Sequence, residues 1–205
     1  MIVRIGLALA LLLVALLVAA QLLLPDRVAG GVEERLSEGG GSAEVSVEAL
    51  PAARLLFGDG DRIEVRGSDL DLDVTEETEV LDRLDGFDEV DVLLEGVAAG
   101  PLDVDSFALT REGGDVYALR TTATTTGTEL LEYGAETFAP LAGPLVGALT
   151  DEAPAAARER VPVELNMGLV SDDGRIEVVS GDGTIAGFDA GPLAEIVTAA
   201  VVSRL

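Results

Sequence analysis

IGLALALLLVALLVAAQLLL, residues 5–24, is the stretch around which this chain is organised. It contains no charged side chain, and its single polar side chain is Gln21. At a helical rise of about 1.5 Å per residue, such a run spans about 30 Å, the thickness of the hydrocarbon core of a bilayer. A helix that is apolar on all sides is buried in a core or in a membrane. The stretch therefore predicts a transmembrane helix and a protein that works beside a membrane.

The residues around the run predict its orientation and leave its processing open. Arg4 is the only charged side chain before it, and cationic flanks stay on the cytoplasmic side. We therefore expect a single-pass protein of the cell membrane, with its N-terminus in the cytoplasm and its main domain outside. The length of the run favours an uncleaved anchor. The alternative is a signal peptide with a small-residue cleavage site at Val18-Ala19-Ala20.

The composition excludes several functions. The chain has 205 residues and a formal net charge of -25, and such an acidic surface repels nucleic acid, so no nucleic-acid partner is expected. It contains no Cys and no His, which removes thiolate nucleophiles, the commonest general base and the commonest transition-metal ligands. We therefore expect a protein that is not an enzyme and that has no metal site and no cofactor.

Three parts are expected along the chain. Residues 1–24 form the anchor or signal. Residues 25–42 hold a short amphipathic helix, which begins at Pro25 and carries Val28, Val32 and Leu36 on one face, followed by a glycine-rich linker at 39–42. Residues 43–205 form the extracytoplasmic domain, and about 180 residues beyond the leader are enough for one such domain.

Apolar and polar side chains alternate through most of residues 43–205, a pattern typical of strands with one wet face. The expected strands are residues 44–49, 62–66, 69–74, 89–95, 102–109, 116–126, 161–167 and 175–179, with a turn at 181–183. A one-residue slip between Val104 and Phe107 predicts a bulge. Short helices are expected at 51–57 and 75–84, and an amphipathic helix at 192–205. The predicted fold class is α+β, with an N-terminal transmembrane or signal helix and a curved antiparallel sheet of about seven or eight strands packed around helices.

Residues 128–150 are strongly apolar but are interrupted by Pro140 and Pro144. Two interpretations stay open. The segment is either a kinked helix packed on the sheet or a flexible lid over an apolar cavity.

Acidic residues cluster in several places without forming a recognisable site. Asp59 and Asp61 lie in a glycine-containing turn, and Asp182 lies in another, but neither has the spacing of a calcium-binding loop. Asp103 and Asp105 are regular alternation partners of apolar residues, as are the three aspartates at 69, 71 and 73. Because a wet sheet face explains them, we expect no catalytic carboxylate pair here.

Several of these stretches together resemble the LmeA-like phospholipid-binding family of exported, membrane-anchored bacterial proteins. The resemblance is carried by LPAARLLFG (50–58), DRIEV (61–65), DL (69–70), FDEVDV (87–92), VPV (161–163) and VSDDG (170–174), and it covers most of residues 25–187. The chain departs from the family in its lack of a lipidation Cys and in its unusually apolar, proline-broken segment. The resemblance implies a fold similar to tubular lipid-binding proteins, in which a curved sheet around a helix holds acyl chains.

The family resemblance implies that the chain binds or carries a lipid in the cell envelope. We expect a phospholipid or related acyl lipid in an apolar groove of residues 43–205, held by burial. The candidate lining residues, taken from the alternation and the apolar segment, are Val90, Val92, Leu94, Leu102, Val104, Tyr133 and Phe138. For each of them the alternative is plain core packing. The alternative function is a structural or interaction module of the envelope without a ligand.

Overall fold

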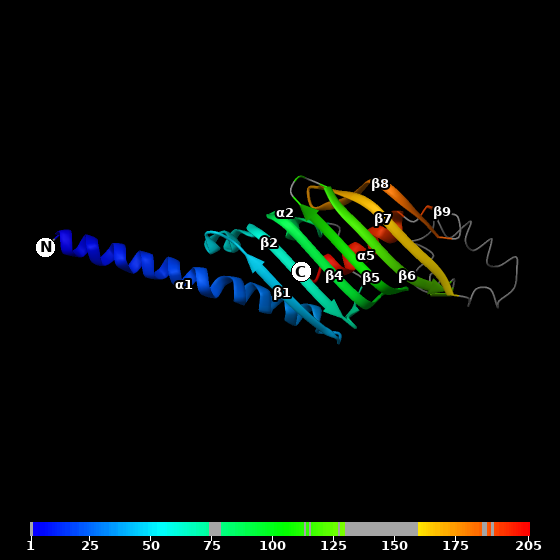
Figure 1. Ribbon diagram of the computed structural model, residues 1–205, viewed down its shortest axis with the longest axis horizontal. Helices are drawn as coiled ribbons and strands as arrows, with labels where there is room; N and C mark the ends of the chain where they lie inside the picture. The colour runs from blue at the N-terminus through cyan, green and yellow to red at the C-terminus, as the bar shows by residue number, and fades with distance from the viewer. Residues whose placement is uncertain are drawn as a thin grey trace, which may run out of the picture.

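The computed structural model describes residues 2–73, 79–112, 114, 116–126, 128–129, 160–185, 188–189 and 191–205. Figure 1 shows a long N-terminal helix that runs out from one end of a broad sheet. Tyr133, Phe138 and nearly all of the predicted lid or kinked helix at 128–150 lie outside the described residues.

The long helix is α1, Ile2–Leu36. The sequence predicts a short amphipathic helix that continues from the apolar run at Pro25, and α1 does continue through Pro25. Beyond this point the helix is amphipathic, and Val32 and Leu36 are buried as predicted. In the part of the chain that the structure describes, no helix is long and apolar enough to cross a membrane. The membrane span at residues 5–24 therefore stays a prediction.

The turn after α1 is tightly packed. A Cβ on Gly39 would lie 2.2 Å from the backbone oxygen of Asp71, and Gly41 has a φ of +79°, which favours glycine. The predicted linker is therefore a close contact between the end of α1 and the sheet. The predicted domain boundary at residue 42 stays a prediction. The last turns of α1 pack in the same core as the strands.

The sheet confirms the α+β class. Its strands are β1 Ser42–Glu48, β2 Gly60–Ser68, β3 Asp71–Leu72, β4 Phe87–Ala99, β5 Leu102–Glu112, β6 Val116–Thr126, β7 Arg160–Asp172, β8 Arg175–Ile185 and β9 Phe188–Asp189. The main path runs β1-β2-β4-β5-β6-β7-β8-β9, and β3 pairs with β4 beside it. Most pairs are antiparallel, but β2 and β3 each pair with β4 in parallel. A parallel pair needs a crossover, which the residues between β2 and β4 provide.

The helices are η1, a 3-10 helix at Ala52–Phe57; α2, Asp82–Asp85; and α5, Gly191–Val202. The predicted helices at 51–57 and 192–205 are thus found. The helix predicted at 75–84 is described only as the short α2, which ends at Gly86 as expected. Of the strand predicted at 69–74, residues 69–73 are described, and among these Asp71 and Leu72 form β3.

The predicted turn at 181–183 is wrong. β8 continues to Ile185, and Gly181 and Asp182 pair with Met167 and Asn166 of β7. Gly181 has a φ of +131° and lies close to the backbone of Met167, so it fits a strand at a point where a side chain would clash. Glycine and aspartate therefore stand here in a strand, although they are the usual residues of turns.

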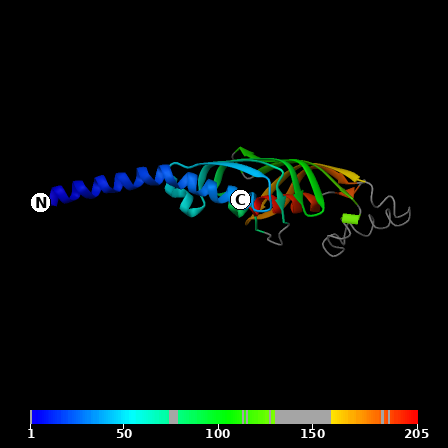
Figure 2. The same cartoon turned by 90° about the horizontal axis from the view of Figure 1, so that it is seen from below.

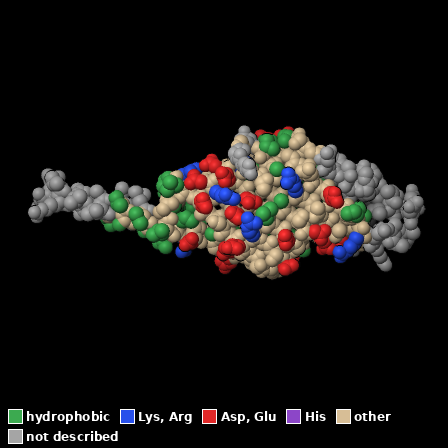
Figure 3. All heavy atoms as spheres, in the orientation of Figure 1, with side chains coloured by type: hydrophobic (Ala, Val, Ile, Leu, Met, Phe, Trp, Pro, Cys, Tyr) green, Lys and Arg blue, Asp and Glu red, His purple; other side chains and the backbone are tan. Residues whose placement is uncertain are grey.

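The sheet and helices form two layers. Figure 2 shows α5 and the end of α1 on one side of the sheet, which we call the inner face. The core lies between them, and Arg35 of α1 donates a 2.7 Å hydrogen bond to the backbone oxygen of Leu205, which joins α1 to the C-terminal residues that follow α5. The opposite, outer face carries acidic and basic side chains (Figure 3).

Candidate functional site

Five of the predicted lining residues lie together on the inner face. Val90, Val92 and Leu94 alternate along β4 and are each at most 2% exposed. Leu102 and Val104 on β5 are equally buried. Their cross-strand partners are Ala99 and Val97, while Val92 and Leu94 pair with Leu109 and Phe107. The structure therefore confirms that these five side chains share one apolar face.

Two matched irregularities keep this face apolar. On β5 the inward residues change from Val104 to Phe107, and the register with β6 shifts between Val104 and Ser106, as the predicted bulge requires. On β4 the inward residues change from Leu94 to Val97, across Gly96 at a φ of +64°. Because both strands slip at the same level, the inward residues on either side of the slip keep apolar partners: Leu94 pairs with Phe107, and Val97 pairs with Val104. The sequence analysis predicted the slip in β5 and missed the one in β4.

The described part of the inner face is covered by helices. The buried side chains opposite the strands include Ala29, Val32 and Leu36 of α1, Val80, Leu81 and Leu84 in and before α2, and Ala194, Val197, Ala200 and Val201 of α5. The five predicted residues are therefore core residues in this structure.

Two buried hydroxyl groups on this inner side have no hydrogen-bond partner among the described residues. Thr121 on β6 is 3% exposed and Thr198 on α5 is 0% exposed. Within the residues that the structure describes, neither Oγ1 makes a hydrogen bond. An unpaired buried hydroxyl costs about 1–3 kcal/mol, so a ligand or water that bonded to it would recover that energy.

A buried polar cluster closes one end of the inner face, and the sequence analysis missed it. Arg111 on β5 is 7% exposed and donates hydrogen bonds to the backbone oxygens of Leu84, Asp85 and Phe87. Its guanidinium lies 4.6 Å from the ring centre of Tyr117. The signal was present, because Arg111 has the same inward parity as Leu109.

Tyr117 and Ser171 complete this cluster around Asp85. The Tyr117 hydroxyl donates to Asp85 Oδ1 at 2.8 Å, and Ser171 Oγ donates to Asp85 Oδ2 at 2.5 Å. Burial, followed by the hydrogen bond to Asp85, raises the pKa of Tyr117 above its ordinary value. Tyr117 therefore stays neutral, and the cluster fastens α2 to the sheet. We call these four residues the Asp85 cluster.

The outer face carries a network of arginines and carboxylates. Arg62 lies 3.6 to 3.8 Å from carboxylate oxygens of Glu64, Glu89 and Asp91. The hydrogen bond to Glu64 raises the pKa of Arg66. A shallow depression of about 540 Å³ lies next to this network. It is lined mainly by outward residues of four strands, which are Ser42, Glu44, Arg66, Ser68, Leu93, Glu95, Ser106 and Ala108.

Among the described residues, no three Asp or Glu side chains lie close enough together to hold a metal ion. This includes the described acidic turns. Asp61 instead accepts hydrogen bonds from Arg54 and from the backbone nitrogen of Leu50. Asp103 pairs with Arg160 at 3.2 Å, and Asp73 pairs with Arg204 at 3.1 Å. These carboxylates therefore have structural partners on the surface.

No family model, no curated protein and no solved structure matches this chain. The fold class and the two faces of the sheet are therefore the structural evidence that bears on function.

Proposed function

We propose that this chain is a membrane-anchored extracytoplasmic protein that binds a phospholipid or a related acyl lipid against the inner face of its sheet. The observation that carries the proposal is the continuous apolar inner face. It extends from Val45 on β1 to Leu169 on β7, and it includes all five described lining residues. The resemblance to the LmeA-like family supports the same function and places it in the lipid homeostasis of the cell envelope.

The binding energy would come from burial of the acyl chain. Each buried methylene contributes about 0.8 kcal/mol, so a chain of about 16 carbons offers on the order of 10 kcal/mol before the costs of association. To admit it, α5 and the end of α1 would have to move away from part of the sheet. Their packing on the sheet is apolar, and a lipid chain offers the inner face the same kind of contact.

The orphan hydroxyls of Thr121 and Thr198 support a ligand with a polar group at one end. A purely apolar interior would leave both without a partner, and neither has one within the part of the chain that the structure describes. The ester oxygens of a phospholipid are hydrogen-bond acceptors, which suit a threonine hydroxyl as donor. A phospholipid therefore fits this face better than a plain hydrocarbon.

Cross-linking with a photoactivatable phospholipid tests the proposal. The full chain is reconstituted in vesicles that contain the probe, irradiated and digested, and the cross-linked peptides are identified by mass spectrometry. We expect saturable labelling of inward residues of β4 and β5 that unlabelled phospholipid suppresses. Labelling confined to residues 5–24 and to surface residues would show that the protein only touches the membrane, and would overturn the proposal.

A second candidate is an interaction module of the envelope without a ligand. The depression and the arginine–carboxylate network on the outer face favour it, because they present both charge signs to a protein partner. This function requires a core that stays closed. It predicts no lipid cross-links on β4 or β5, and a partner whose binding weakens when Arg62 and Arg66 are changed to Ala.

A further inference from the structure

Gln21 fixes the position of the sheet along α1. It is the single polar side chain of the apolar run, and it bonds to the segment that joins β1 to η1. Its Nε2 donates to the backbone oxygen of Ala49 at 2.8 Å, and its Oε1 accepts from the backbone nitrogen of Ala52 at 2.8 Å. The segment from Ala49 to Ala52 is thus held at the level of residue 21 of the helix.

Large apolar side chains are exposed at this level. Leu50 is 74% exposed, Leu56 is 67% exposed and Phe57 is 83% exposed. We call these three residues the apolar tip. On α1 itself, Leu22 and Leu23 are 67% and 66% exposed. Arg54 of η1 lies beside the tip, and its charge is paired with the carboxylate of Asp61, which is 2.5 Å away.

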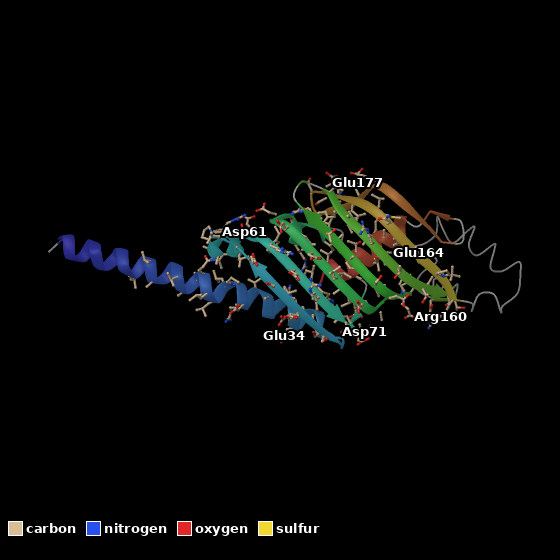
Figure 4. The ribbon with its side chains drawn as sticks, viewed as in Figure 1. Glu34, Asp61, Asp71, Arg160, Glu164 and Glu177 are labelled. Atoms are coloured by element: carbon tan, nitrogen blue, oxygen red, sulfur yellow. The ribbon has the colours of Figure 1, made fainter. Side chains whose placement is uncertain are left out.

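The tip lies at the end of the sheet from which α1 leaves. Figure 4 places Asp61 at that end, beside η1, and places Asp71 and Arg160 at the opposite end. Figure 3 shows hydrophobic side chains along the outgoing part of α1 and at the adjoining end of the body. Exposed apolar side chains of the tip and of α1 are therefore found near the same end of the body.

The proposed anchoring of residues 5–24 sets the depth of the tip, and the inference rests on it. Gln21 is three residues before the end of this run, which corresponds to about 5 Å along the helix. Leu50 lies in the segment bonded to Gln21, and η1 with Leu56 and Phe57 follows it directly, so with this anchoring the tip would reach the boundary between the hydrocarbon and the headgroups. We propose that the apolar tip inserts into the leaflet on the side of the main domain, as a second membrane contact beside α1.

This contact would set the orientation of the sheet. A helix alone leaves the domain free to turn about its axis, whereas two contacts fix which end of the sheet faces the lipid. Because the protein carries a net charge of -25, repulsion from anionic headgroups opposes a close approach, and burial of Leu50, Leu56 and Phe57 would offset it.

The chain contains no Trp, so a single one reports on the tip. The full-length Phe57→Trp variant is reconstituted in phosphatidylcholine vesicles, with and without brominated acyl chains. The matched control is Val179→Trp on β8, where the native side chain is 51% exposed. β8 lies six strand positions from β1, or about 29 Å at 4.8 Å per strand.

We expect emission from Phe57→Trp to be blue-shifted and at least halved by brominated lipid, while Val179→Trp emits as in water and is not quenched. Flotation of the vesicles is measured on the same samples. If the protein floats with the vesicles but Phe57→Trp emits like the control, the anchor stands and the tip inference is wrong. A blue shift without quenching would mean that protein covers the tip, which also overturns it.

Failure to float would overturn the proposed anchoring, and the tip inference with it. A second probe guards against an effect of the Trp side chain. The chain has no Cys, so a fluorescent label on Leu56→Cys can be placed at one site only. It should show the same quenching by brominated lipid as Phe57→Trp, and an unquenched label would contradict the inference.

Discussion

The hydroxyl of Tyr117 donates a hydrogen bond to Oδ1 of Asp85 over 2.8 Å, and so joins the start of β6 to the end of α2. The two residues are 32 positions apart in the chain. Tyr117 is fully buried, and Arg111 lies against its ring. The Asp85 cluster therefore links four separate elements, α2, β5, β6 and β7, through a partly buried carboxylate.

Removal of this hydroxyl should destabilise the fold. In Tyr117→Phe, the half-buried Asp85 loses a donor that is itself fully buried, and we expect the free energy of unfolding to fall by about 1–2 kcal/mol. Chemical denaturation of the full chain in detergent measures it. Thr122→Val is the control, because its hydroxyl shares an exposed 2.7 Å hydrogen bond with Ser106 and should matter less. Equal losses in the two variants would contradict the assigned role.

The same tyrosine should make stability depend on alkaline pH. Its pKa is raised in the folded protein, whereas the unfolded chain has the ordinary value of 10.0. The stabilisation from neutral Tyr117 is fully present below pH 10 and is lost as pH rises toward the folded-state pKa. Above pH 10 the free energy of unfolding should fall by up to about 1.4 kcal/mol per pH unit.

The Tyr117→Phe variant serves as the reference for this measurement. Denaturation of both proteins at several pH values between 9 and 11 should show that their difference in stability shrinks as pH rises. Other groups titrate equally in the two proteins and cancel. A difference that stays constant over this range would show that Tyr117 does not titrate as inferred.

Arg111 should be essential for the closed end of the core. Arg111→Leu leaves three backbone oxygens and the Asp85 carboxylate without this donor, and we expect a loss of about 3–5 kcal/mol or failure to fold. Arg160→Leu removes an exposed ion pair with Asp103 and should change stability by less than about 1 kcal/mol. Thermal unfolding followed by circular dichroism compares the two. If Arg111→Leu unfolds at the same temperature as Arg160→Leu, the Asp85 cluster is not needed for stability.

Substitution of Thr198 by Val should raise the stability of the protein and lower its binding of lipid. Its buried hydroxyl has no partner among the described residues, so Thr198→Val should raise the free energy of unfolding of lipid-free protein by about 1 kcal/mol. If a lipid ester accepts from this hydroxyl, the variant should also capture less photoactivatable phospholipid. Ala199→Ser, at the partly buried neighbouring position, controls for changes in α5 alone. Unchanged capture would remove Thr198 from the proposed site.

Replacement of glycine by alanine should lower the free energy of unfolding at Gly41 and raise it at Gly30. Gly41 has a φ of +79°, and a Cβ there would lie 2.3 Å from the backbone oxygen of Asp69, so Gly41→Ala should cost about 2 kcal/mol or more. Gly30 lies within α1, and a Cβ added there would meet no atom within 4 Å, so Gly30→Ala should stabilise by about 0.5–1 kcal/mol. Urea denaturation measures both. A Gly41→Ala protein as stable as the parent would show that the turn is loose.

For several strands, the sequence predicted which side faces the core. Side chains alternate with a period of two whatever the strand pairs with, so Val92 and Leu94 on one strand and Leu102 and Val104 on the next could be assigned from their neighbours alone. The slip before Phe107 was visible for the same reason. The turn predicted at Gly181 failed, because glycine also fits a strand where another backbone comes close.

The long helix, the inward parity of the strands and the hairpin turns were thus determined locally, by spacing and by the conformational preferences of a few residues. Only the tertiary structure decided that β2 lies parallel to β4, that Asp85 meets Tyr117, and that Gln21 holds the segment beside Leu50. Each of these contacts joins residues far apart in the chain. Their formation depends on how the whole sheet and its helices pack together, and no local pattern carries that information.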